Sequence, residues 1–339
     1  MNKPTDFAYS LTKYLTDYLS ATIGASKNTI ISYRDTFKLL LIYTSKQKSK
    51  KPEMLVLADF DRDFILDFLD WLENERGCSV QTRNQRLTAV HAFCKYLQIE
   101  HAEYIFTFQK IIAIPKKKCN QKLVSFLSIE GIELLLQQPD ASSDSGKKHL
   151  ILLTFMYATA CRVQEAVDAV IEDYKYNGTN LMKLTGKGKK SRLVPLEKTV
   201  VKLMDNYIES RRENILFSEK DWLFLNHSGQ KLSRQGVSSI IKKYADMARE
   251  KRPDLIPKGI SPHTFRHSRA VHWLQAGVEL VYIRDLLGHV SVQTTEVYVK
   301  IDSDMKRKAL EKLSSTQSMN LPEWQKNQDL MAWLKSLGN

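Results

Sequence analysis

The chain has 339 residues, and 51 Lys and Arg against 38 Asp and Glu give it a formal net charge of +13 at pH 7. Hydrophobic residues make up 43% of the sequence, which excludes wholesale disorder and allows two domains with packed cores. A positive surplus of this size favours a polyanionic partner over a small metabolite. Such a partner is favourable because Lys and Arg that neutralise phosphates release counterions. Charge by itself favours nucleic acid over an anionic membrane surface by only about two to one.

Residues 1–113 have the apolar spacing of a helical module, with few strand signals. Helices are expected over residues 7–18, 26–44 and 61–77, and a fourth is expected to start at Ser79. The expected DNA-facing residues are polar or basic, namely Lys27, Asn28, Arg83, Asn84 and Arg86. Solvated helix surface is an equally good interpretation of each of them.

A lysine-rich segment over residues 114–122 follows this module. Pro115 precedes three consecutive lysines, Lys116, Lys117 and Lys118. This composition is typical of a linker between domains. A solvated spacer is one interpretation, and a segment that follows DNA phosphates is the other.

Residues 123–313 predict a second, α/β domain. Helices are expected over 128–138, 149–159, 200–212, 233–248, 264–276 and 281–287. Two short alternating runs, 179–184 and 192–196, predict a β-hairpin with a glycine- and lysine-rich tip. Lys187 lies between two glycines there, and Lys189 and Lys190 follow as expected DNA contacts. The predicted fold is therefore mainly α with a small β-sheet. A C-terminal tail over 314–339 adds a short amphipathic helix at 330–337.

Two basic residues in the second domain stand out, although each has a simple structural interpretation by itself. Arg162 interrupts an apolar helix end and could form a salt bridge to Glu165, three residues later. Lys187 could be a solvated turn residue.

A third feature is the run Ser261-Pro262-His263-Thr264-Phe265-Arg266-His267. The first two residues suit a helix start, which places His263 and Arg266 on one face. Free N–H groups at a helix N-terminus favour anions, so a phosphate pocket is plausible here. An ordinary helix start is the simpler interpretation of this run by itself.

Two further features follow in the chain. His289 comes directly after a glycine that ends a predicted helix, where a histidine can cap the helix dipole. Tyr298 ends the run 294–298, and an unmarked tyrosine is more often a core residue than a nucleophile.

Other kinds of site are poorly supported by the sequence. His263, His267 and His272 do not have the spacing of a zinc motif, and no phosphate-binding loop of a nucleotide hydrolase occurs. The four cysteines are scattered, which favours a reduced cytoplasmic protein. The longest apolar stretch, 150–161, is far short of the roughly 20 residues that span a membrane.

Taken together and in order, these features resemble the tyrosine recombinase (phage integrase) family, in particular compact Xer-like recombinases and transposon integrases. The family's set of Arg, Lys, His-x-x-Arg, His and Tyr matches six residues here: Arg162, Lys187, His263, Arg266, His289 and Tyr298. Two departures are visible. The family often has Thr-Gly-Leu-Arg where this chain has Thr159-Ala160-Cys161-Arg162, and the tail after Tyr298 is longer than in the Xer group.

The resemblance implies a catalytic role for each of the six matched residues. Tyr298 would attack a phosphodiester and form a 3′-phosphotyrosine, while Arg162 and Arg266 hold the non-bridging oxygens. Lys187 would protonate the leaving 5′ oxygen and His263 would take the phenol proton. His289 would donate a hydrogen bond to the phosphate. Glu165 and His267 would support these groups, with no metal or other cofactor.

The resemblance also implies a fold and partners. A helical core-binding domain and an α/β catalytic domain would form a C-shaped clamp around double-stranded DNA that carries inverted-repeat sites. The working unit would be a homotetramer in the bacterial cytoplasm, with the tail helix possibly exchanged between protomers. An accessory DNA-bending factor or a second recombinase could take part.

Four functions remain open at this point. The preferred one is the site-specific recombinase or integrase of a mobile element. A Xer-type chromosome dimer resolvase and a non-catalytic DNA-binding relative are the alternatives. A type IB topoisomerase shares the tyrosine chemistry but fits the layout of the chain less well.

Overall fold

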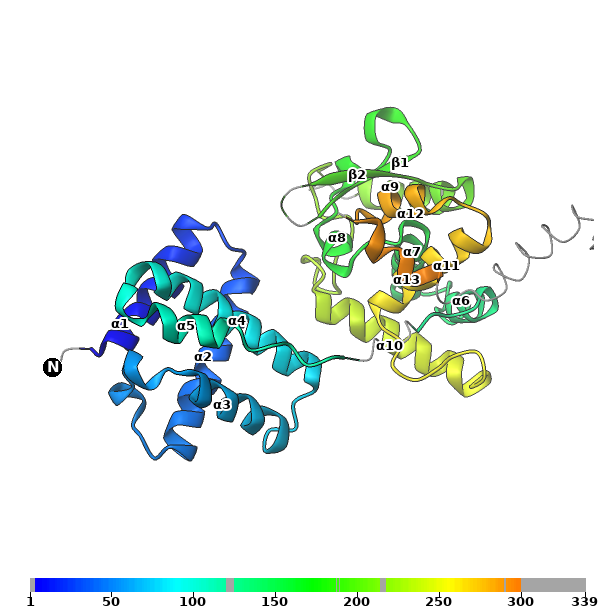
Figure 1. Cartoon of the computed structure of the whole chain (residues 1–339). Coiled ribbons are helices and arrows are strands. Elements are labelled where there is room, and N and C mark those ends of the chain that lie inside the picture. The colour runs from blue at the N-terminus through cyan, green and yellow to red at the C-terminus, as the bar shows by residue number, and fades with distance from the viewer. Residues whose placement is uncertain are drawn as a thin grey trace, which may run out of the picture. The chain divides into compact units, whose positions relative to one another are not determined.

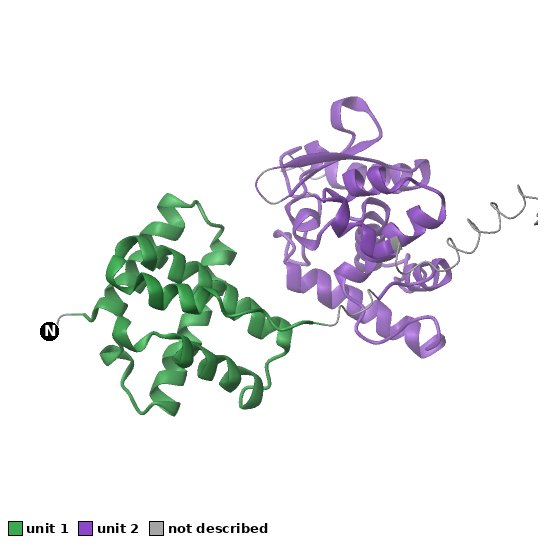
Figure 2. Cartoon of the chain, in the orientation of Figure 1, with its two compact units in different colours: residues 1–121 green, residues 122–339 purple. Residues whose placement is uncertain are grey.

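In a computed structural model of the protein, the described residues are 4–119, 125–186, 188, 190–213, 218–289 and 291–299. The chain divides into two compact units, Met1–Gln121 and Lys122–Asn339 (Figure 2). The division falls inside the lysine-rich segment 114–122. Within the described ranges, no helix combines the length and apolar character needed to cross a membrane.

Unit 1 is entirely helical (Figure 1). Its elements are α1 (Asp6–Lys13), η1 (Tyr14–Thr22), α2 (Lys27–Gln47), η2 (Pro52–Met54), η3 (Leu57–Asp59), α3 (Arg62–Asn74), α4 (Val80–Glu100), η4 (Ala102–Tyr104) and α5 (Ile105–Ile112). Side chains of Thr5, Ser26, Asp61 and Ser79 cap the N-termini of α1, α2, α3 and α4. The short helix α5 was not predicted as a separate element.

The first predicted helix changes geometry half-way. From Tyr14 onward it is a π-helix. The hydroxyls of Thr12, Thr16 and Ser20 each donate to the carbonyl four residues earlier. Because such bonds compete with the backbone ladder, they favour a local departure from α-helical geometry.

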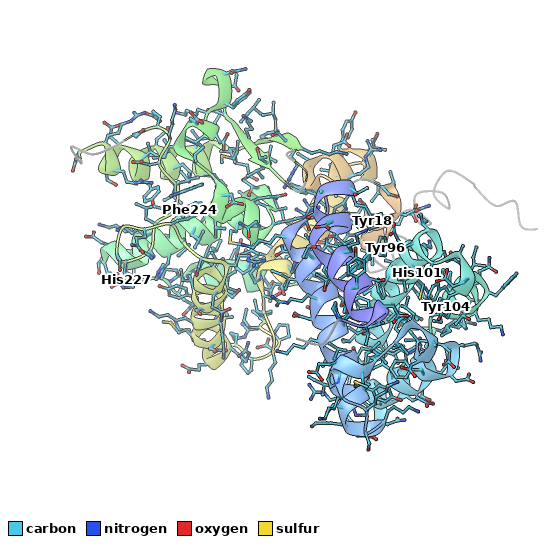
Figure 3. The ribbon with its side chains drawn as sticks, turned by 90° about the vertical axis from the view of Figure 1, so that its left-hand side faces the viewer. Tyr18, Tyr96, His101, Tyr104, Phe224 and His227 are labelled. Atoms are coloured by element: carbon cyan, nitrogen blue, oxygen red, sulfur yellow. The ribbon has the colours of Figure 1, made fainter. Side chains whose placement is uncertain are left out.

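Aromatic rings fill the core of unit 1. Phe93 of α4 is fully buried, and its ring centroid lies 4.9–5.9 Å from those of Phe37, Tyr14, Phe7 and Phe60. Tilted and edge-to-face pairs of this kind add to the stabilisation from buried area. At the rim of this core, the rings of Tyr18 and Tyr96 pack together, with 4.7 Å between their centroids (Figure 3).

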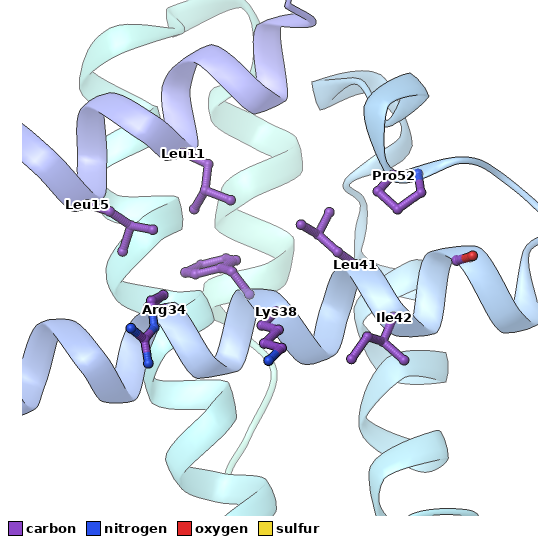
Figure 4. Close-up of a pocket in the computed structure, with 9 residues that line it drawn as sticks. Leu11, Leu15, Arg34, Lys38, Leu41, Ile42 and Pro52 are labelled. Carbon is purple, nitrogen blue, oxygen red and sulfur yellow. The ribbon is translucent and has the colours of Figure 1, made fainter.

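Unit 1 also has an apolar groove of about 470 Å³ between α1, η1, α2 and η2 (Figure 4). Leu11, Leu15, Leu41, Ile42 and Pro52 are among its lining residues. The groove belongs to unit 1, whereas every predicted catalytic residue belongs to unit 2.

Unit 2 is helical around one β-hairpin (Figure 1). Its elements are α6 (Ile129–Leu136), α7 (Asp144–Thr159), α8 (Val163–Asp168), η5 (Ile171–Asp173), η6 (Tyr176–Gly178), β1 (Leu181–Thr185), β2 (Ser191–Pro195), α9 (Lys198–Arg212), α10 (Arg234–Lys251), α11 (Pro262–Gln275), α12 (Leu280–Leu287), η8 (Val292–Thr294) and α13 (Glu296–Val299). The strands pair antiparallel, from Leu181 opposite Pro195 to Thr185 opposite Ser191. The predicted fold class, mainly α with a small β-sheet, is confirmed.

Helix α7 forms the centre of unit 2 and leads directly into the site. It packs against α9 and α11, and Leu153, Phe155 and Met156 are fully buried. The helix ends at Ala160, which has a left-handed backbone (φ 47°, ψ 33°). Glycine adopts this conformation most easily, so the common family glycine would be relaxed where Ala160 is strained. The turn directs the chain into Arg162.

Candidate active site

Two arginines distant in the sequence meet at the carboxyl end of α12. Arg266 of α11 donates from one guanidinium nitrogen to the carbonyl of Ala160 at 2.8 Å and from the other to that of Leu287 at 2.5 Å. Arg162, at the start of α8, donates to the carbonyl of Gly288 at 3.2 Å. Both guanidiniums are therefore anchored by backbone carbonyls, so their positions do not depend on a bound substrate.

The end of α12 also positions His289. Gly288 closes the helix with a left-handed backbone (φ 61°), which turns the chain so that His289 follows directly. Nδ1 of His289 lies 3.0 Å from the Thr295 hydroxyl. Burial, together with Arg266 and Arg162, lowers the pKa of His289 to about 4, so the ring is neutral at pH 7.

The carboxylate of Glu165 fixes the side chain of Arg162 in the site. Glu165 is 3% exposed, and its carboxylate accepts hydrogen bonds from Nη1 of Arg162 at 2.8 Å and from the Arg162 backbone N–H at 2.7 Å. Burial by itself would raise the pKa of Glu165, but the hydrogen bonds and charges of Arg192 and Arg162 lower it to about 2.

Arg192 is a residue that the sequence reasoning missed. It lies on β2 and binds both carboxylate oxygens of Glu165, at 2.9 and 2.7 Å, while its Nε donates to the Leu286 carbonyl at 2.7 Å. It therefore joins the hairpin, the start of α8 and the end of α12. The sequence contains one hint of this role. Arg192 is a charged residue on a predicted strand that continues with the apolar residues Leu193 and Val194.

Tyr298 lies on α13 with only 1% of its surface exposed. Its hydroxyl is hydrogen-bonded to Nδ1 of His267 at 2.9 Å. The predicted proton acceptor, His263, is exposed and stacks on the His267 ring, with 6.1 Å between centroids. Burial raises the pKa of Tyr298, although the charges of Arg266 and Arg162 oppose this shift.

The site carries a net positive charge. Among the described residues, the guanidiniums of Arg162, Arg192 and Arg266 lie around the carboxylate of Glu165. Burial and the neighbouring Arg162 lower the pKa of Arg266 to about 10, which still leaves it charged at pH 7. Such a cluster suits a phosphodiester, whose non-bridging oxygens gain charge during substitution at phosphorus.

The structure brings together four of the six predicted catalytic residues, Arg162, Arg266, His289 and Tyr298, with His263 next to them on α11. The sixth, Lys187, lies outside the described residues, as do Lys189 and the tail helix at 330–337. Lys190 is exposed, and its carbonyl accepts a hydrogen bond from Gly186 at the base of the hairpin tip. The catalytic roles of these residues remain predictions.

The predicted DNA-facing residues of unit 1 have different environments. Lys27, Lys116, Lys117 and Lys118 are exposed. Arg83 is 3% exposed and donates to the carbonyl of Pro115 at 3.4 Å, so it holds the lysine-rich segment from inside.

Arg86 is also turned inward. It is half-buried and donates to the Ser32 carbonyl and to the Thr36 hydroxyl, both at 3.1 Å. A long arginine that starts on a polar helix face can reach back into the unit. DNA contact by Arg83 and Arg86 remains a prediction that would need these side chains to turn outward.

The metal alternative gains no support from the histidines. His272 is bonded through Nδ1 to the Tyr157 hydroxyl at 2.8 Å, and His267 is bonded to Tyr298. Among the residues with described placement, no group of three or more His, Cys, Asp or Glu is arranged to hold a metal ion.

Two family models match the chain. The model described as "Phage integrase family" matches residues 125–305. The model described as "Phage integrase, N-terminal SAM-like domain" matches residues 12–101. The first match contains all six predicted catalytic residues.

Curated relatives agree with these matches. The chain is 34% identical over 337 residues to a putative integrase/recombinase, y4rC, of Sinorhizobium fredii, covering 99% of this chain and 100% of that protein. It is 32% identical over 281 residues to tyrosine recombinase XerD of Staphylococcus haemolyticus, covering 82% of this chain and 89% of that protein.

Solved structures show the same fold. The Tn1549 transposon integrase in complex with transposon right-end DNA matches with a TM-score of 0.69 at 14% identity, over 89% of this chain and 98% of that one. The XerH recombinase bound to palindromic difH matches with a TM-score of 0.68 at 21% identity, over 91% of this chain and 90% of that one.

Proposed function

Since this chain belongs to the phage integrase family and is a tyrosine recombinase, we propose that it cuts and rejoins duplex DNA through a covalent 3′-phosphotyrosine at Tyr298. The observation that carries the proposal is the meeting of Arg162 and Arg266 at the end of α12, beside His289 and the hydroxyl of Tyr298. This arrangement combines an anion site with an oxygen nucleophile, as phosphoryl transfer requires.

In the proposed step, the oxygen of Tyr298 bonds to phosphorus as the bond from phosphorus to the 5′ oxygen breaks. The phenol proton passes to His263, and Lys187 supplies a proton to the leaving 5′ oxygen. Arg162 and Arg266 stabilise the charge on the non-bridging oxygens, and lysine could not replace their planar fork. The 5′ hydroxyl of a partner strand then reverses the step and restores the phosphodiester.

The biological role that we propose is integrase of a mobile element. The chain is 34% identical to the putative integrase/recombinase y4rC over 99% of its length, and 32% identical to two XerD relatives over 82% and 86%. A second putative integrase/recombinase, y4rD, is 29% identical over 76% of the chain. The similarity of fold to a transposon integrase is compatible with this role. A Xer-type chromosome dimer resolvase is the second candidate, supported by XerD relatives up to 32% identical.

The proposed substrate is double-stranded DNA with inverted-repeat sites, which the two units would clamp. Recombination exchanges strands between two duplexes, so the proposed working unit is a homotetramer on DNA, with or without an accessory factor. The tail 314–339 could be exchanged between protomers. Removal of residues 318–339 tests this last point, since unchanged assembly and cleavage control would contradict it.

A trapping assay tests the proposed reaction. Inverted repeats from the DNA that flanks the gene are prepared as nicked suicide duplexes and incubated with wild type or Tyr298→Phe without divalent metal. The wild type should give a slow protein–DNA band on a denaturing gel, and the variant should give none. Binding without any adduct would favour the non-catalytic DNA-binding alternative.

Two further observations separate the remaining alternatives. Terminal repeats beside the gene favour the mobile-element role, whereas one fixed chromosomal site shared with a second recombinase favours the resolvase. Relaxation of supercoiled plasmid without any specific site would favour a type IB topoisomerase.

A further inference from the structure

The side chain of Tyr298, with its hydroxyl, is almost completely shielded from solvent. The tyrosine is 1% exposed, and it belongs to a small apolar cluster with Val271 and Leu274 of α11 and Ile283 and Leu287 of α12. A phosphodiester is larger than a water molecule. It therefore cannot reach this hydroxyl unless the side chain moves.

A hydrogen bond to His267 holds the hydroxyl in this position. Nδ1 of His267 lies 2.9 Å from it, and the two rings are tilted by 53° with 5.7 Å between their centroids. Burial, with His263 and Arg266 nearby, lowers the pKa of His267 to about 4, so the ring is neutral at pH 7. With its proton on Nε2, the ring accepts a hydrogen bond from the tyrosine at Nδ1.

The cations that would receive the phosphate are, in contrast, already in place. Arg162 and Arg266 are fixed by the backbone carbonyls of Gly288, Ala160 and Leu287. The Arg162 side chain is 38% exposed, so part of it faces solvent. The structure therefore combines an assembled cluster of arginines with a covered tyrosine.

We propose that His267 is a latch, whose Nδ1 holds the Tyr298 hydroxyl in a resting position and must release it before the hydroxyl attacks phosphorus. The inference rests on the proposed function, because it takes Tyr298 as the nucleophile. His267 acts through the tyrosine and is a positioning residue. This role differs from the proton transfer assigned to His263.

Two substitutions of His267 distinguish the effect of the Nδ1 hydrogen bond from the effect of removing the imidazole ring. Asparagine places its amide group where Nδ1 lies, whereas glutamine reaches to the position of Nε2. His267→Asn should therefore keep the latch and His267→Gln should lose it. The loss of one hydrogen bond of ordinary net strength shifts the open population by about 2- to 12-fold.

Nitration of tyrosines by tetranitromethane in the absence of DNA measures how accessible the Tyr298 phenol is. A tryptic peptide over residues 285–300 contains Tyr298 as its only tyrosine. Peptides 270–284 and 203–211 carry the controls, Tyr282, which is 60% exposed, and Tyr207, which is 7% exposed. Tyr298 should be protected in wild type and His267→Asn, and its nitration should rise about 2- to 12-fold in His267→Gln.

The rate of adduct formation on a nicked suicide duplex gives a second readout. His267→Gln should form the adduct faster than wild type by up to the same factor, and faster than His267→Asn. The latch is overturned if Tyr298 is as reactive as Tyr282 in wild type, or if Tyr298 is nitrated equally in the two variants. It is also overturned if His267→Gln forms the adduct no faster than wild type. Nitration of the buried control Tyr207 in both variants would overturn it as well, because the variants would then be generally loosened.

The failure of the proposed function has a different signature. In that case the wild type binds DNA and forms no adduct, while the difference in nitration between the two variants is still measured.

Discussion

At the scale of single residues, Glu165 organises the positive charges of the site. It is a buried carboxylate shared by Arg162 and Arg192, and it keeps two guanidiniums next to each other that would otherwise repel. Removal of one partner from such a buried group leaves uncompensated charge, which costs several kcal/mol. Glu165 therefore links the stability of unit 2 to the geometry of the anion site.

Substitution of Glu165 by glutamine should lower the free energy of unfolding by about 3 kcal/mol at pH 7, because the neutral amide leaves the positive charges of Arg162 and Arg192 uncompensated. Urea unfolding followed by circular dichroism measures this change. Glu209→Gln is a suitable control, since Glu209 is an exposed partner of Arg212 on α9. A loss no larger than that of the control would contradict the role of Glu165.

The same carboxylate predicts a pH dependence. Its pKa of about 2 lies below the ordinary value of 4.5, so its ionised form stabilises the folded chain fully above about pH 4.5. This contribution is lost as the pH falls toward 2. The difference in unfolding free energy between wild type and Glu165→Gln should shrink by more than half from pH 7 to pH 3, and a constant difference would be inconsistent with this account.

Arg192 should be needed for cleavage more than for DNA binding. Lysine cannot bind both oxygens of Glu165 and the Leu286 carbonyl together, so Arg192→Lys should misplace the end of α12. We expect adduct formation to slow by about 10- to 100-fold. DNA affinity, measured by gel shift, should change much less.

Arg249→Lys provides a control for this substitution, because Arg249 of α10 binds a carboxylate and two backbone carbonyls, where Arg192 binds a carboxylate and one carbonyl. Equal effects of the two substitutions on adduct formation would show that Arg192 has only a general structural role.

At the scale of elements, the sequence patterns predicted most helices and the hairpin, because caps, apolar periodicity and the glycines at the tip are local signals. The features that were missed depend on tertiary packing. His263 and His267 lie one turn apart on α11, so spacing alone could not decide which of them contacts Tyr298. The partnership of Arg192 with Glu165 likewise joins residues 27 positions apart.

The lysine-rich segment shows the same limit. Composition predicted a linker over 114–122, but the structure attaches its first half to α4. The side-chain amide of Asn84 donates to the carbonyl of Lys117 at 2.8 Å and accepts from its N–H at 3.1 Å. Residues 115–119 are thus held by unit 1, which composition does not reveal.

Loss of this attachment should expose the segment to protease. In Asn84→Ala, tryptic cleavage after Lys116, Lys117 or Lys118 should become about 2- to 12-fold faster, as expected for the loss of ordinary hydrogen bonds. Gln85→Ala is the matched control, because Gln85 bonds to Ser32 of α2 instead. Equal cleavage in both variants would mean that Asn84 does not hold the segment.

At the scale of the whole molecule, each unit has its own hydrophobic core and its own positive surface or site. Unit 1 presents exposed lysines at the start of α2 and in the segment after α5, and unit 2 holds the arginine cluster. With a net charge of +13, the chain suits a long polyanion that engages both units. In the proposed reaction, such a substrate becomes bonded to Tyr298.

Identification of the residue that carries the DNA tests this bond most directly. The adduct from a nicked suicide duplex is digested with nuclease and trypsin, and the peptides are sequenced by mass spectrometry. We predict a nucleotide remnant on Tyr298 in peptide 285–300. A remnant on another residue, such as Tyr282, would contradict the assignment of the nucleophile and the mechanism built on it.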